Sequence, residues 1–184
     1  MFQNSYQNLT VDIIVDDFPI HPRENSENLG QIYALHKRYQ FSEIKLDNSQ
    51  CNSWQDEYSL IRKELDIALI LPLYLYDHSG LAISLTPFSC RWDSGQLGYI
   101  FVTKKRLREF FDCRRISRNY LEKARKSLDL EVAEYNLYLQ HEVYNVAVLD
   151  NTKQILDSCF GIYGYQNAQA IGEKMKQSLI RKCA

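Results

Sequence analysis

The strongest constraint on the fold is an apolar run, IALILPLYLY, which covers residues 67–76 and is followed by the residues DHSG and the apolar stretch LAISL. Two apolar segments joined by the turn-forming residues Asp77–Gly80 predict a β-hairpin. Pro72 in the first segment indicates an edge or a bulge, because proline cannot donate a ladder hydrogen bond. The run is shorter than the roughly 20 residues that cross a bilayer, so we expect a sheet and no membrane role.

Other segments alternate between strand and helix patterns. Stretches rich in β-branched and aromatic residues predict strands at residues 11–18, 97–103, 143–149 and 154–163. Apolar residues at steps of three and four predict helices at residues 31–38, 54–65, 104–111, 117–141 and 168–179. Ser53, Thr103 and Ser117 are the expected N-caps. The sum is an α+β fold, with a mainly antiparallel sheet and a long helix and a C-terminal helix packed on one face.

The chain carries no obvious boundary between domains. Its 184 residues contain no repeat, no low-complexity tract and no linker rich in proline, glycine and serine. We therefore expect a single domain over residues 1–184. In that domain, one sheet would hold the strands near residues 67–76, 81–85, 97–103, 143–149 and 154–163.

Composition excludes several classes of protein. The formal net charge of −1 fits neither a polyanionic mimic of DNA nor a strongly basic nucleic-acid binder. The N-terminus has no signal-peptide pattern, and no metal or cofactor is expected. The five cysteines form no CxxC pair, which predicts reduced thiols in a cytoplasm rather than a zinc site or a disulfide scaffold; they are Cys51, Cys90, Cys113, Cys159 and Cys183.

The stretch PFSCRWDSGQ, residues 87–96, holds the densest set of reactive side chains. If it folds over the neighbouring hairpin turn, His78 could act as the base for Cys90, oriented by Asp77 or Asp93. The spacing matches no cysteine-hydrolase signature. The alternatives are a structural turn that buries the indole of Trp92 and a binding surface that includes Trp92 and Gln96.

A second stretch, LDSCFGIYGY, covers residues 156–165. Gly161 favours a β-bulge over a close approach to a flat ligand. Asp157 is a candidate binding residue, and its convergence with Asp77 and Asp93 on a hard cation is a minor option, because the spacing resembles no calcium loop. Single histidines such as His36 give little support for zinc.

A third feature is a basic segment, KKRLREFFDCRRISR, at residues 104–118. Its positive field would attract phosphate-rich nucleic acid, a nucleotide or an acidic protein face. The alternative is a solvated surface whose side-chain stems cover apolar area. The candidate binding residues are Arg106, Arg108, Arg114, Arg115 and Arg118.

The motifs YDHSG, PFSCRWDSGQ and DSCFGIYGY resemble those of an uncharacterised family of small proteins found in bacteriophages, plasmids and bacterial genomes. The likeness covers most of the chain, from Pro22 to Tyr165. Arg91 stands where the family often has proline, and Phe160 where it often has tryptophan. The resemblance implies a phage or mobile-element setting, in which host manipulation is the expected role.

Two functions follow from these features. The first is a phage or mobile-element accessory protein that binds a host factor or a protein–nucleic acid complex, with a host defence system as one target. The alternative is a small cysteine-dependent hydrolase or transferase centred on Cys90 and His78. A dyad requires hydrogen-bond reach between these two side chains. We further expect the 87–96 loop and the Asp77–Gly80 turn at one end of the sheet, with Trp92 largely buried as an anchor.

Overall fold

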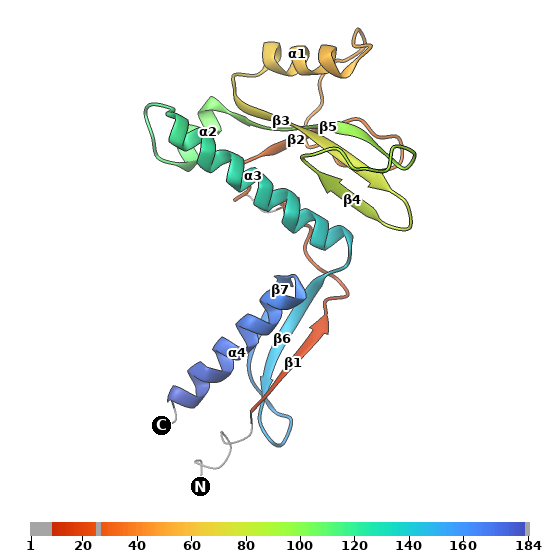
Figure 1. The fold of residues 1–184 in the computed structure, drawn as a ribbon. Coiled ribbons are helices and arrows are strands. Elements are labelled where there is room, and N and C mark those ends of the chain that lie inside the picture. Colours follow the sequence, from red (N-terminus) through yellow and green to blue (C-terminus); the bar gives the residue numbers. More distant parts are fainter. Residues whose placement is uncertain (1–8, 25–26, 183–184) are drawn as a thin grey trace. The chain divides into compact units, whose positions relative to one another are not determined.

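The computed structural model describes residues 9–24 and 27–182, and it confirms the α+β class. The described elements form two antiparallel sheets and four α-helices, together with a short 3-10 helix at Pro22–Glu24 (Figure 1). The chain divides into two compact units, residues 25–136 and residues 1–24 with 137–184. Among the described helices, none combines the length and apolar character needed to cross a membrane.

The prediction that five strands share one sheet is wrong. β3, β4 and β5 lie in a four-stranded sheet of order β2-β5-β3-β4, whereas β6 and β7 lie in a three-stranded sheet of order β1-β6-β7. Strand patterns identify strands but not their partners, and both sheets recruit a strand from the N-terminal part of the chain. The long helix and the C-terminal helix therefore belong to different sheets. The single domain over residues 1–184 stays a prediction.

The predicted hairpin is confirmed. β3 (Ile67–Asp77) pairs with β4 (Leu81–Ser84), and Asp77 stands opposite Leu81 across the turn. β4 covers only the end of β3 from Tyr74 onward, so Pro72 lies where β3 has no strand on that side. A register shift between Leu73 and Tyr74 in the pairing with β5 (Ser94–Thr103) lies close by. The expectation of an edge or bulge at Pro72 therefore agrees with the pairing.

The helix predicted at residues 31–38 is wrong. The chain forms β2 (Gln31–Ala34), which pairs antiparallel with β5 and buries Ile32, Tyr33 and Ala34 in succession. Pairing across the sheet outweighs the weak helical spacing of four residues. A Cβ atom on Gly98 would lie 2.0 Å from the carbonyl oxygen of Tyr33, so only glycine permits this close approach of β5 to β2.

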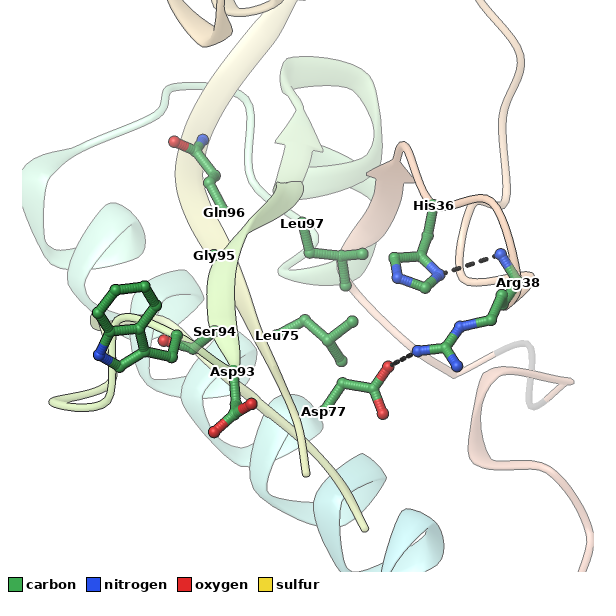
Figure 2. A pocket seen from close by; sticks show the side chains of 10 residues that line it. His36, Arg38, Leu75, Asp77, Asp93, Ser94, Gly95, Gln96 and Leu97 are labelled. Carbon is green, nitrogen blue, oxygen red and sulfur yellow. Dashed lines mark hydrogen bonds and ion pairs between the residues drawn. The ribbon is translucent and has the colours of Figure 1, made fainter. Parts of the chain in front are cut away.

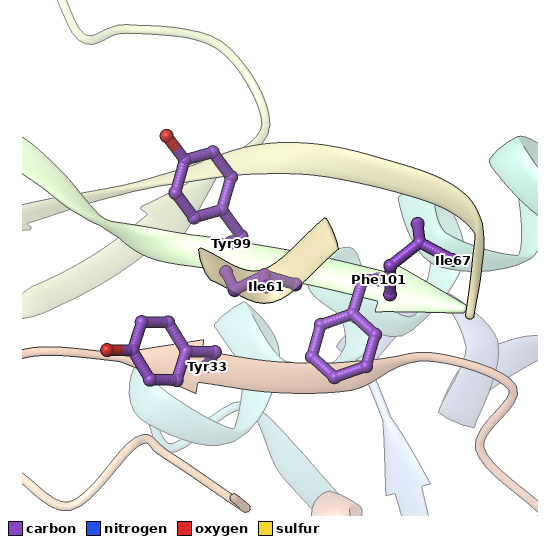
Figure 3. Close-up of a cluster of buried hydrophobic side chains, with 5 residues drawn as sticks. All are labelled: Tyr33, Ile61, Ile67, Tyr99 and Phe101. Atoms are coloured by element: carbon purple, nitrogen blue, oxygen red, sulfur yellow. The ribbon is translucent and has the colours of Figure 1, made fainter. Parts of the chain in front are cut away.

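Helices cover both faces of the four-stranded sheet (Figure 1). α1 (Trp54–Glu64) packs Ile61 against Tyr33, Tyr99 and Phe101 on one face (Figure 3). α3 (Arg118–Leu139) lies over the other face, where Leu128 is fully buried close to Gly30.

The helix starts follow the predicted caps. The Ser53 side chain accepts the amide N–H of Asp56, and Thr103 Oγ1 accepts that of Arg106 at the start of α2 (Lys104–Phe110). α3 begins directly after Ser117 and ends two residues before the predicted end at residue 141.

The three-stranded sheet combines β1 (Thr10–Val15), β6 (Val143–Leu149) and β7 (Ile155–Tyr163), and α4 (Tyr165–Lys182) packs on it. Val146, Ile162 and Ala168 form its core. The pairing skips between Val146↔Cys159 and Tyr144↔Ile162, and Gly161 in this gap has φ 67. Gly161 therefore marks the predicted β-bulge.

Candidate functional site

The candidate site lies at one end of the four-stranded sheet, where β3 ends and β5 begins. Tyr76 pairs with Ser94, and the amide N–H of Asp77 donates to the carbonyl oxygen of Asp93 at 2.8 Å. This pairing places the Asp77–Gly80 turn and the 87–96 loop at the same end of the sheet, as predicted. It also brings together Asp77, at the end of β3, and Asp93, just before β5 (Figure 2).

A pocket of about 360 Å³ opens between these carboxylates and the loop that follows β2. His36 and Arg38 line it from that loop, Gln96 lines it from β5, and Asp93 lines it from the position just before β5 (Figure 2). Trp92 is also among the lining residues. The pocket therefore presents charges of both signs.

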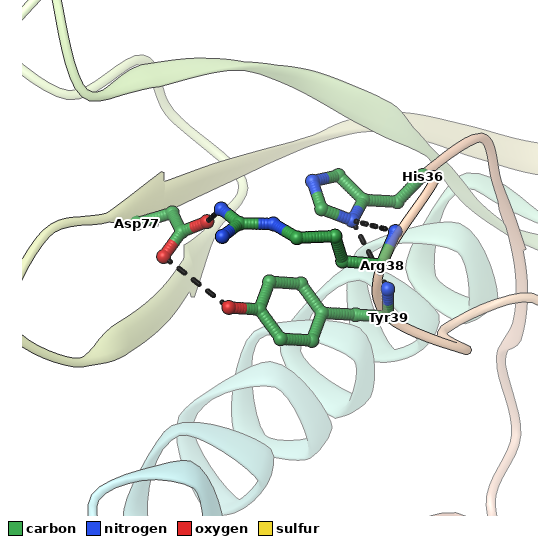
Figure 4. A network of polar contacts seen from close by, with 4 residues as sticks. All are labelled: His36, Arg38, Tyr39 and Asp77. Carbon is green, nitrogen blue, oxygen red and sulfur yellow. Dashed lines mark hydrogen bonds and ion pairs between the residues drawn. The ribbon is translucent and has the colours of Figure 1, made fainter.

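A polar network fixes the β2 side of the pocket (Figure 4). The Arg38 guanidinium forms an ion pair with Asp77, and the Tyr39 hydroxyl donates to the other carboxylate oxygen of Asp77 at 3.4 Å. His36 Nδ1 accepts the amide N–H groups of Arg38 and Tyr39 at 3.3 and 3.2 Å. The His36 ring also stacks on Tyr39, with centroids 4.9 Å apart. These contacts hold Arg38 and His36 in one arrangement.

Asp93 lies between the two proposed catalytic partners. The Cys90 thiol donates to Asp93 Oδ2 at 3.4 Å, and His78 Nδ1 lies 3.6 Å from the same oxygen. A thiolate nucleophile needs a base or a positive neighbour, but in the described contacts the thiol faces a carboxylate. No hydrogen bond joins Cys90 to His78 in the part of the chain that is described, so the geometry gives the proposed dyad no support.

The prediction that Trp92 is buried is wrong, because its side chain is 95% exposed. The loop holds its shape through polar contacts instead. The Ser94 hydroxyl donates to the carbonyl oxygen of Cys90, and Cys90 contacts Asp93. The loop therefore needs no indole as an anchor, and Trp92 is free to contact a partner.

The other predicted binding residues are less uniform. Gln96 Nε2 donates to the carbonyl oxygen of Gly98 at 3.3 Å, which orients the amide beside the pocket. Asp157 lies on β7, in the other unit, where its carboxylate accepts the amide N–H of Ser158 at 2.9 Å. Within residues 9–24 and 27–182, no group of three His, Cys, Asp or Glu side chains could hold a metal.

The basic segment is partly engaged in internal contacts. Arg106 Nη2 donates to the carbonyl oxygen of Asn28 at 2.7 Å, and Arg118 Nε pairs with Glu122 at 3.0 Å. Arg108, Arg114 and Arg115 are exposed, and no ion pair joins them to a described acidic residue. Three of the five predicted arginines therefore remain available.

Four of the five cysteines are described, and all four are free thiols: Cys51, Cys90, Cys113 and Cys159. Cys183 lies outside the described residues. That the thiols are reduced in a cytoplasm stays a prediction.

Sequence reasoning missed the Arg38–Asp77 pair and the buried carboxylate of Glu57. Arg38 was expected on a helix, so nothing connected it to the hairpin turn 39 residues later. Glu57 is only 4% exposed, although its place in the first turn of a capped helix is typical of a surface carboxylate. The only available signal was the run HKRYQ after β2, which is too polar for a buried helix.

Comparison with known proteins adds no relative, since the chain matches no family model, no curated protein and no solved structure.

Proposed function

We propose that this chain is a non-enzymatic accessory protein of a phage or mobile element, which acts in a cytoplasm by binding a host protein or protein–nucleic acid complex. The surface that makes the contact comprises Trp92 and the adjoining pocket. The setting comes from the resemblance of the motifs, and a host defence system is a target consistent with it.

The exposure of Trp92 carries the proposal. An indole that is 95% exposed gains nothing for folding, and tryptophan is among the residues that contribute most to protein interfaces. The ring lies beside a pocket whose polar side chains are already held in place by the Arg38–Asp77 pair and by His36. Preorganised polar groups beside an exposed aromatic ring lower the entropic cost of binding.

The cysteine-dependent hydrolase or transferase is the less supported alternative. Its nucleophile would be Cys90, but the thiol donates to Asp93, and His78 approaches that same carboxylate. In the described contacts, Asp93 and not His78 accepts the hydrogen bond of the Cys90 thiol. A binding function requires none of these groups to change partners.

The exposed arginines supply a second contact for an anionic partner. Arg108, Arg114 and Arg115 lie in the α2–α3 region and have no described acidic neighbour in ion-pair reach. Exposed positive side chains accelerate association with anionic partners and make it salt-dependent. Reversing Arg108 and Arg115 to glutamate is expected to weaken capture and to flatten its salt dependence, with little change in melting temperature.

A pull-down from host lysate tests the proposal with matched variants. Trp92→Ala should lose a partner that the wild-type chain retains, while Phe18→Ala should keep it, because Phe18 is a similarly exposed aromatic residue (92%) in the other unit. Cys90→Ser should also keep it. Retention of every partner by Trp92→Ala would contradict the proposal. If the wild-type chain instead shows a catalytic turnover that Cys90→Ser alone loses, the enzyme alternative is favoured.

A further inference from the structure

We propose that a second pocket, at the start of α1, binds an alkylammonium group with Glu57 as its counter-ion. This pocket has a volume of about 290 Å³ and is lined by Leu35, Cys51, Asn52, Ser53, Trp54 and Glu57. It shares no lining residue with the pocket beside Trp92, and the inference does not rest on the proposed function.

The first argument is the burial of the Glu57 carboxylate. Glu57 is 4% exposed, and its two oxygens accept hydrogen bonds from the Tyr33 hydroxyl at 2.6 Å and from Asn48 Nδ2 at 3.0 Å. Both donors are neutral. A buried charge is costly unless a charge of opposite sign pairs with it, and no described basic side chain forms an ion pair with Glu57. Each oxygen also keeps acceptor capacity beyond one hydrogen bond.

The second argument is the sign of the local field. Burial and the neighbouring Glu57 raise the pKa of the Tyr33 hydroxyl. Burial, followed by the negative charges of Glu57, Asp56 and Asp47, raises the pKa of the Cys51 thiol. The N-terminus of α1 contributes only about half a positive charge, which is less than the two carboxylates in its first turn. The pocket therefore favours a cation.

The third argument is the mixture of apolar and polar residues that line the pocket. Leu35 and Trp54 supply apolar surface, whereas Cys51, Asn52 and Ser53 supply polar groups. Among the described residues that line the pocket, none is basic. An apolar stem ending in a positive charge matches this combination, because the stem contacts Leu35 and Trp54 while the ammonium pairs with Glu57.

Two sources carry this chemistry, namely a lysine side chain of another protein and a free alkylamine. Titration of the full chain with n-butylammonium and with the peptide acetyl-Gly-Lys-Gly-amide, followed by amide NMR shifts of residues 51–57, separates them. Saturation by both probes indicates a lysine source, and saturation by n-butylammonium alone indicates a small amine. Either result supports the ammonium site.

Two controls isolate the charge. Glu57→Gln should weaken n-butylammonium binding at least tenfold, and n-butanol should give no saturable shift in the wild-type chain, because it supplies the stem without the charge. Equal binding of n-butylammonium by Glu57→Gln, equal binding of n-butanol, or no saturation in the wild type would each overturn the proposal.

A second variant guards against loss of folding in Glu57→Gln. Leu35 is 40% exposed and lines the pocket, so Leu35→Lys introduces a tethered ammonium at its mouth. This variant should weaken n-butylammonium binding at least tenfold, whereas Leu130→Lys, at a 70% exposed position of α3 that does not line the pocket, should bind it as the wild type does. Unchanged binding by Leu35→Lys would overturn the proposal.

Discussion

The two sheets differ in how many of their faces are covered, and the burial patterns of their strands differ accordingly. In β5, the residues from Leu97 to Val102 are all buried, because α1 and α3 cover both faces of the four-stranded sheet. In β6, buried Val143, Val146 and Val148 are separated by less buried residues. The continuous buried run in β5 thus reflects a strand covered on both faces, and the interrupted burial in β6 reflects one covered face.

The difference also decides where function can be built. The four-stranded sheet holds both proposed pockets at the ends of well-packed elements, which suits sites that must keep their geometry. The three-stranded sheet packs against α4, and several large apolar side chains in its unit remain exposed: Ile14, Val15, Phe18, Ile20, Ile155 and Phe160. We expect the first sheet to tolerate backbone crowding less well than the second.

The largest effect is expected for Gly98→Ala. The new Cβ atom would lie 2.0 Å from the Tyr33 carbonyl oxygen and 2.8 Å from the Ala34 Cα atom. Both neighbours are backbone, so relief requires separation of β2 from β5. We expect a loss of about 3 kcal/mol or more in the free energy of unfolding, measured by urea denaturation.

Gly95→Ala is the matched control, because a Cβ atom at this position of the same strand meets nothing within 4 Å. A change of less than about 0.5 kcal/mol is expected there. Similar losses in both variants would show that strand propensity, and not the contact with β2, limits stability.

The next effect concerns the free edge of the four-stranded sheet. Asn136 on α3 accepts the amide N–H of Ile83 at 2.7 Å and donates to the Ile83 carbonyl oxygen at 2.6 Å. The side chain thus replaces a neighbouring strand on β4. Asn136→Ala leaves both backbone groups without this partner and should cost about 2 kcal/mol in thermal or urea unfolding.

Asn119→Ala, at an exposed position of the same helix, should change stability by less than about 0.5 kcal/mol. If Asn136→Ala changes the stability just as little, water replaces Asn136 as the hydrogen-bond partner of the Ile83 backbone groups. The edge of β4 is then less protected than the contacts indicate.

Local patterns were sufficient to predict the hairpin, the caps at Ser53 and Thr103, and the bulge at Gly161. Each of these depends on residues that are near one another in the sequence. The division into two sheets depends on long-range pairing, in which β1 and β2 join strands far along the chain. The helix prediction for residues 31–38 was wrong for the same reason. The four residues of β2 pair with β5, which is distant in the sequence, and their helical spacing arises by chance.

The candidate site divides along the same line. The proximity of the hairpin turn and the 87–96 loop follows from adjacent strands and was predicted. The exposure of Trp92 was not, because the size of an indole predicts burial and the loop is held by Cys90, Asp93 and Ser94 instead. The Arg38–Asp77 pair depends on the path of the loop after β2. The hydrophobic periodicity of the sequence does not predict the path of a loop.

A smaller effect is expected at the bulge of the three-stranded sheet. Gly161 has φ 67, and a Cβ atom there would meet nothing within 4 Å. Gly161→Ala therefore adds backbone strain without crowding and should cost about 1 kcal/mol. Gly80→Ala, also in open space but without a positive φ, should change the urea midpoint less. The reverse order would mean that the β6–β7 pairing shifts to relieve the bulge.

The smallest effect is a pH dependence at the β6–β7 turn. Asp150 Oδ1 accepts the amide N–H groups of Thr152 and Gln154 and the Thr152 hydroxyl at 2.7–2.9 Å. These hydrogen bonds, led by that of the Thr152 side chain, lower the pKa of the Asp150 carboxyl. Because the pKa is lower in the folded state, the ionised carboxylate stabilises the fold at pH values above the unfolded-state pKa. This stabilisation is lost as the pH falls below about 4. Asp150→Asn should therefore be less stable than the wild type at pH 7 in urea unfolding, and this difference should shrink as the pH falls below about 4. A wild-type advantage that persists undiminished at pH 3 would mean that the turn depends on the shape of the side chain and not on its charge.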